Sequence, residues 1–67
     1  MKTGNIYLVT YKQYKNDVIP LTVKVFAFDK IECELKIDEA GLIKYTDSFA
    51  NNSGYIISIK IVESGIL

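Results

Sequence analysis

The chain has 67 residues, with eight lysines and eight acidic residues, one cysteine, no histidine and no arginine. This length predicts a single domain, residues 1–67, close to the lower limit at which one apolar core can offset the entropy of ordering the backbone. Zero net charge gives no general electrostatic attraction to nucleic acid or to an anionic membrane. Arginine, whose side chain is the best suited to bind phosphate and guanine with paired hydrogen bonds, is missing. The lone Cys33 excludes an intrachain disulfide. Because histidine is also absent, we expect neither a metal site nor a cofactor.

The N-terminal residues predict a cytosolic protein. The longest apolar run among the first twelve residues has only four members, which is too short for a signal-peptide core or a membrane span. Ten isoleucines and eight lysines without arginine are typical of an AT-rich genome, such as that of a low-GC bacterium or its phage. The expected location is therefore the cytoplasm of a bacterial host.

Three segments have the composition of β-strands. Asn5–Lys12 and Leu21–Phe28 are rich in β-branched and aromatic residues and are joined by a polar connector, which is typical of a hairpin. Tyr55–Glu63 is the third such segment and follows a turn-forming Asn-Asn-Ser-Gly sequence. Pro20 cannot donate to a sheet ladder, so the strand that it precedes is expected at an edge.

The segment from Asp29 to Gly41 has two competing interpretations. Apolar and charged residues alternate between Ile31 and Ile37, which is typical of a half-buried strand and would give a five-stranded all-β domain. Alternatively, Asp29 caps a helix together with Glu32, and Gly41 ends it. The helix is favoured because the join from the preceding strand lacks the Gly or Asn of a two-residue hairpin turn. The predicted fold is thus α+β, ββαβ, with a three-stranded antiparallel sheet in the order 2-1-3 and one helix on one face.

A single helix can cover only one of the two faces of this sheet. Its buried side is expected to contain Cys33, Ile37 and Ala40, packed on the more apolar face. Strict alternation places Tyr55 on this covered face and the next residue, Ile56, on the opposite one. The opposite face stays open unless the chain's tails and the segment from Leu42 to Phe49 fold over it.

The open face and the outer side of the helix are the expected binding surfaces. Contiguous exposed apolar surface beyond a few hundred Å² usually marks an interaction site, and Phe26 and Phe28 are suited to act as its anchors. The residues predicted to bind a protein partner are Ile6, Leu8, Lys12, Lys24, Phe26, Phe28, Ile56, Lys60 and Val62 on the sheet and Ile31 and Leu35 on the helix.

The residues that most enzymes use are missing from the chain. Without histidine the usual catalytic triads cannot form, and no glycine-rich phosphate loop is present. Cys33 lies between Glu32 and Glu34, whose charges raise the pKa of a thiol, so a buried structural thiol is expected. The sequence predicts a protein that is not an enzyme.

The stretch Val25 to Glu32, which has the pattern V-F-A-x-D-x-x-E, leads from an edge strand into a capped helix. This join resembles that of small phage-encoded ββαβ proteins that inhibit host enzymes, of which the podovirus inhibitors of host RNA polymerase are an example. The similarity extends over the order of the secondary-structure elements, but similarity of amino-acid sequence covers only these eight positions. The third strand of those inhibitors carries arginines, whereas here it offers only Lys60. The resemblance implies a compact domain that blocks a host enzyme, and the departure leaves the target open.

Together these observations predict a small non-enzymatic module that binds protein stoichiometrically, as a phage or mobile-element protein that inhibits or modulates a host protein. The alternative is a self-associating homodimeric structural subunit, in which a second copy joins through open faces or edge strands. A weak single-stranded nucleic-acid binder using Lys12, Lys24 and Lys60 is disfavoured, because three lysines without arginine make a poor phosphate platform. No membrane partner is expected.

Overall fold

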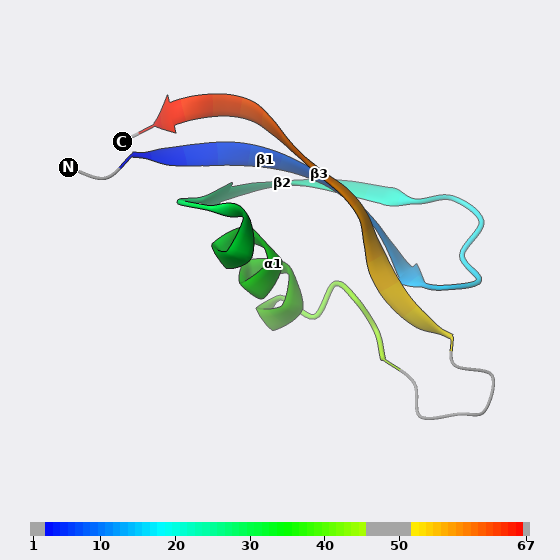
Figure 1. Ribbon diagram of the computed structural model, residues 1–67. Helices are drawn as coiled ribbons and strands as arrows, with labels where there is room; N and C mark the ends of the chain where they lie inside the picture. Colours follow the sequence, from blue (N-terminus) through cyan, green and yellow to red (C-terminus); the bar gives the residue numbers. More distant parts are fainter. Residues whose placement is uncertain (1–2, 46–51, 67) are drawn as a thin grey trace.

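The computed structural model describes residues 3–45 and 52–66 of the chain. Its elements are, in chain order, β1 (Gly4–Tyr14), β2 (Leu21–Ala27), α1 (Lys30–Glu39) and β3 (Ser53–Ile66). The strands form one antiparallel sheet in the order β2-β1-β3, and α1 lies against one side of it (Figure 1). The predicted ββαβ fold with the order 2-1-3 is confirmed, and the five-stranded alternative is wrong.

Helix α1 begins and ends where its capping residues predict. Asp29 is extended, and its side chain accepts a hydrogen bond of 2.7 Å from the backbone N–H of Glu32. The Glu32 carboxylate in turn accepts the N–H of Phe28 at 3.0 Å, one residue before the position that a standard capping box uses. Gly41 follows the C-cap with φ of 70°, a conformation that favours glycine. No helix in residues 3–45 or 52–66 is long and apolar enough to cross a bilayer.

The core lies between α1 and the face of the sheet that the helix covers. Its buried residues are Tyr7, Val9 and Tyr11 of β1, Ala27 of β2, Cys33 and Ile37 of α1, and Ile43. Cys33 and Ile37 are one turn apart, so both point to the sheet. Ala40, predicted to share their buried side, is exposed, because it is the C-cap at which the helix ends.

The segment that follows α1 also packs on the helix side of the sheet. Ile43 belongs to the core and Leu42 packs against it. The N–H of Lys44 donates to the carbonyl of Gln13 at 3.0 Å, and the carbonyl of Lys44 accepts the N–H of Gly54 at 2.8 Å. The alternative in which this segment folds over the open face is therefore wrong for residues 42–45. Residues 46–49 lie outside the described part of the chain.

Strand β3 contains three register shifts relative to β1. The pairing skips Ile57, Val62 and Gly65, so each is an extra residue on β3, and Gly65 has φ of 75°. A bulge reverses which of the following residues point to each face of the sheet. Strand β3 is also an edge strand, and its bulges interrupt the straight backbone that another strand would need for pairing.

The bulge at Ile57 exchanges two predicted positions. Tyr55 pairs with Lys12 on the open face, whereas Ile56 pairs with Tyr11 and packs against the core. The placement of Ile56 on the open face, predicted from strict alternation, is thus wrong. Alternation alone cannot reveal the error, because nothing in the run of apolar residues from position 55 to 57 marks the extra one.

Gly54 is the glycine on which the sheet depends most. A Cβ at this position would overlap the backbone carbonyl oxygens of Lys12 and Gln13, and backbone cannot move aside as a side chain can. We expect Gly54→Ala to lower the free energy of unfolding by at least about 2 kcal/mol. The matched control is Gly41→Ala, where nothing lies within 4 Å and only the positive φ opposes a side chain, at a cost of about 1 kcal/mol. Urea unfolding of both variants measures the difference, and equal losses would contradict the assignment.

Cys33 is fully buried, and its burial, aided by the charge of Glu34, raises the pKa of the thiol. We expect the native thiol to react with iodoacetamide at pH 8 at least about tenfold more slowly than the thiol of the chain unfolded in guanidinium.

Because the raised pKa of the Cys33 thiol belongs to the folded state, its contribution to stability is complete below the ordinary thiol pKa and is lost as the pH rises through the raised value. Stability of Cys33→Ala should therefore fall less at alkaline pH than that of the wild type. Equal alkylation rates in native and unfolded protein would contradict this arrangement.

Candidate functional site

The open face of the sheet is the side opposite α1, and no described segment lies over it (Figure 1). Strand pairing arranges its side chains in rows across the sheet, in the strand order β2-β1-β3. From one end to the other, the rows are Phe26–Ile6–Glu63, Lys24–Leu8–Lys60, Thr22–Thr10–Ser58 and Lys12–Tyr55, the last on β1 and β3 only. The face thus changes from aromatic and aliphatic, through basic, to hydroxyl-bearing residues along the strands.

The aromatic end is packed within the chain. The ring of Phe26 lies over Gly4, where a Cβ would overlap it, and contacts the ring of Phe28 edge-on, with a centroid separation of 5.5 Å. The ammonium group of Lys36 lies 5.5 Å from the Phe26 ring centroid and donates a hydrogen bond of 2.6 Å to the Phe26 carbonyl. Both phenylalanines are consequently only half-exposed or less. The apolar patch is smaller than the sequence predicts.

Two lysines flank the centre of the open face. Lys24 and Lys60 are exposed and are the cross-strand partners of Leu8, which is partly buried between them. Alkyl stems of lysine commonly lie along apolar surface while the charge stays in water. The centre of this face therefore presents a leucine with a positive charge on each side.

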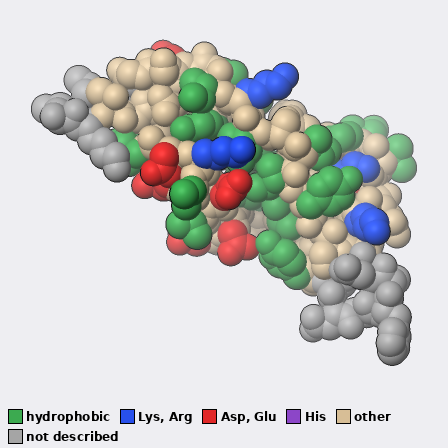
Figure 2. All heavy atoms as spheres, in the orientation of Figure 1, with side chains coloured by type: hydrophobic (Ala, Val, Ile, Leu, Met, Phe, Trp, Pro, Cys, Tyr) green, Lys and Arg blue, Asp and Glu red, His purple; other side chains and the backbone are tan. Residues whose placement is uncertain are grey.

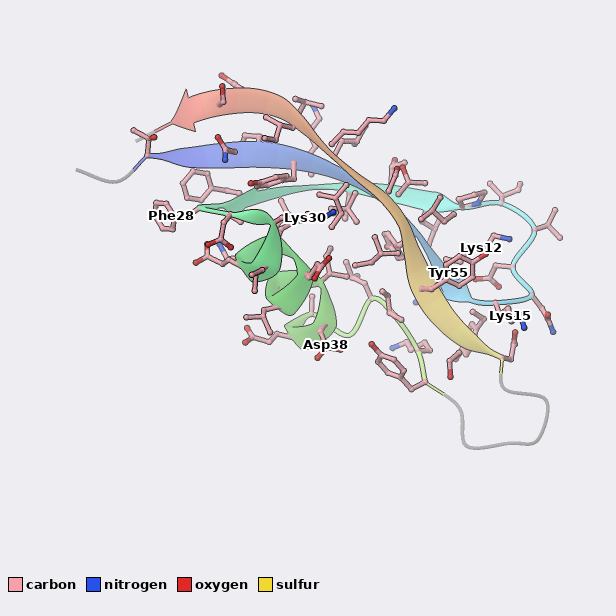
Figure 3. The ribbon with its side chains drawn as sticks, in the orientation of Figure 1. Lys12, Lys15, Phe28, Lys30, Asp38 and Tyr55 are labelled. Atoms are coloured by element: carbon pink, nitrogen blue, oxygen red, sulfur yellow. The ribbon has the colours of Figure 1, made fainter. Side chains whose placement is uncertain are left out.

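The far end of the open face carries Lys12 and Tyr55 on neighbouring strands (Figure 3). Tyr55 is 46 % exposed, and sequence analysis missed it because the bulge moves it to this face. Phe28 lies at the opposite end of the molecule from these two residues (Figure 3). The predicted sheet residues thus extend along the full length of the face and do not form one compact cluster.

The two predicted helix residues lie on the other side of the molecule. Ile31 is 71 % exposed and Leu35 is 56 % exposed, both on the side of α1 turned away from Cys33 and Ile37. Acidic side chains surround hydrophobic ones over α1, as the space-filling view shows (Figure 2). Because α1 and the open face lie on opposite sides of the sheet, the predicted residues form two surfaces instead of one.

Several exposed apolar residues were not among the predicted binding residues. Val18 and Ile19 lie in the hairpin loop, where polar neighbours suggested a simple connector. Ile61 pairs with Tyr7 on a part of the covered face that α1, packed against β2, does not reach, and Ile57 is exposed as the unpaired residue of a bulge. Val62, which was predicted, is half-exposed at a bulge, so its face is not set by pairing. The signal missing from the sequence was the lateral position of the helix on the sheet.

Side chains of α1 also make polar interactions at the surface of the helix. Lys36 and Glu32 form an exposed i,i+4 ion pair of 3.6 Å, which contributes little to stability. The hydroxyl of Tyr45 donates to a carboxylate oxygen of Asp38 at 3.2 Å, and this hydrogen bond raises the pKa of the tyrosine. The end of α1 and the segment after it are thereby held together at the surface.

The described residues contain no group of three or more side chains suited to hold a metal ion, and they enclose no pocket. The arrangement that they do offer is two surfaces of mixed apolar and charged character, on opposite sides of a thin molecule (Figure 1). Comparisons with models of protein families, with curated proteins and with solved structures each gave no match.

Proposed function

We propose that the protein is a non-enzymatic module that binds another protein stoichiometrically through the open face of its sheet. The observation that carries this proposal is that the one helix among residues 3–45 and 52–66 lies, with residues 42–45, on one side of the sheet. Where both faces of a sheet are apolar, both are normally buried. A face that stays exposed to solvent is normally polar. Here Ile6, Leu8 and Phe26 lie on the side that no described segment covers.

The charges of this face define the kind of partner that fits it. Among the described residues that strand pairing places there, three are lysines (Lys12, Lys24 and Lys60) and one is an acid, Glu63. Two copies packed with their open faces together would bring six lysines into contact, which disfavours the symmetric face-to-face dimer. A partner with apolar anchors and acidic neighbours complements this face better. That this chain is encoded by a phage or mobile element and that its partner is a host protein remains a prediction. It rests on the resemblance of residues 25–32 and of the order of elements, and on the composition of the chain.

A single-stranded nucleic acid is the second candidate for this face, and the position of Tyr55 favours it more than the sequence did. Tyr55 is exposed beside Lys12, and an aromatic ring next to a lysine is a common stacking site for a base. Replacing the lysines of this face by acids would weaken binding of either kind of partner. The salt dependence of binding and the identity of the captured molecule distinguish a nucleic acid from a protein.

The test uses exposed lysines, because Phe26 is packed on its own chain. We expect Lys24→Glu combined with Lys60→Glu to lose a protein that wild-type bait captures from a low-GC bacterial lysate in about equal molar amount, with at least about a tenfold fall in affinity. Lys15→Glu combined with Lys44→Glu is the matched control, since both lysines are exposed and lie outside the open face.

Circular dichroism establishes that both double variants keep the wild-type fold. Equal capture by the two variants would contradict the proposal. Tight binding of an oligo(dT) to the wild type, falling steeply between 50 and 200 mM salt, would favour the nucleic-acid candidate instead.

A further inference from the structure

The two candidate surfaces of this chain carry opposite charges. Within residues 29–39, five side chains are acidic and two are lysines, whereas the described residues that pairing places on the open face include three lysines and one acid. In Figure 2 the acidic side chains gather over α1, and most of the lysines in view lie over the strands. The chain is therefore neutral overall but has an acidic side and a basic side.

The exposed side of α1 is an apolar stripe with acids on both borders. At 100° per residue, Ile31 and Leu35 project opposite Cys33 and Ile37, which face the core. The same spacing places two acids on each border of the stripe, and it directs both helix lysines back towards the sheet. The acids are Glu34 and Asp38 on one border and Glu32 and Glu39 on the other.

The open face has the reciprocal arrangement. Lys24 and Lys60 pair with Leu8 from the two outer strands, so their backbones are separated by two strand spacings, about 10 Å. This separation matches the diameter of an α-helix, about 10 Å. A helix lying along β1 would place its apolar stripe on Leu8 and Ile6 and its acidic borders near the two lysines.

We propose that the open face of one copy binds the exposed side of α1 of a second copy. This inference rests on the proposed function and names the partner of the same face. Ile31 and Leu35 of one copy lie on Ile6 and Leu8 of the next, and the acids that border the stripe face Lys24 and Lys60. Both apolar surfaces are buried, and the acids that border the stripe meet charges of opposite sign at Lys24 and Lys60, whereas the one acid of the open face, Glu63, lies beside Ile6.

The assembly is head-to-tail. Because α1 and the open face lie on opposite sides of one sheet, two copies cannot form both contacts with each other (Figure 1). Each copy instead uses its helix towards one neighbour and its open face towards another, which is a heterologous contact that propagates. Pairing through the edge of β3 competes poorly, because the bulges at Ile57, Val62 and Gly65 break that edge into short pieces.

Two variants that each destroy one surface test the inference. Leu35→Lys disrupts the helix stripe and leaves the open face intact, whereas Lys24→Glu combined with Lys60→Glu does the reverse; all three residues are exposed. By sedimentation velocity up to about 1 mM protein, we expect the wild-type mass to rise beyond a dimer without a plateau, and to fall as salt is added. Each variant alone should stay monomeric. An equimolar mixture should form a heterodimer and nothing larger, because only one intact pair of surfaces remains.

The controls are Val18→Lys, an equal change of apolar residue to lysine in the hairpin loop, and the double variant at Lys15 and Lys44; both should assemble as the wild type does. A monomeric wild type at every concentration, a plateau at a dimer, or a mixture that stays monomeric would each overturn the inference. In any of these cases, capture of a different protein that still depends on Lys24 and Lys60 keeps the proposed function. Loss of that capture as well contradicts both.

Discussion

The structure depends on one geometric constraint: a three-stranded sheet has two faces, and the part of the chain that the structure describes has one helix to cover them. The helix adds Cys33 and Ile37 to a core whose sheet side is Tyr7, Val9 and Tyr11, and Ile43 closes it from the following segment. All of these contacts lie on the same side. The other elements of the described residues are the three strands themselves, so the open face follows from how few elements these residues form.

The chain limits the exposure of that face with side chains instead of a second layer. Phe26 lies over Gly4 and against Phe28, and the lysines at positions 24 and 60 flank Leu8. This local packing makes the open face less apolar than a list of its residues suggests. It also gives the face a charge, which selects between partners more sharply than apolar area can.

The bulges of β3 have consequences for both faces and for the edge. At Ile57 a single extra residue sends Ile56 to the core and Tyr55 to the open face, beside Lys12. The same irregularities make β3 a poor template for strand addition, although it is long, apolar and unpaired on its outer side within the described residues. Binding through faces is thereby favoured over binding through the edge.

The sequence by itself determined the elements, their order and the ends of the helix, because these features depend on local chemistry. Asp29 and Glu32 cap α1, Gly41 ends it at a positive φ, and alternation in the first two strands assigns their faces correctly. Only the tertiary structure decided the phase of β3 and the lateral position of α1. A bulge is fixed by pairing with β1, not by the apolar run that contains it. A helix packed against β2 leaves Ile61 exposed on the covered face, although isoleucine is a residue typical of a core.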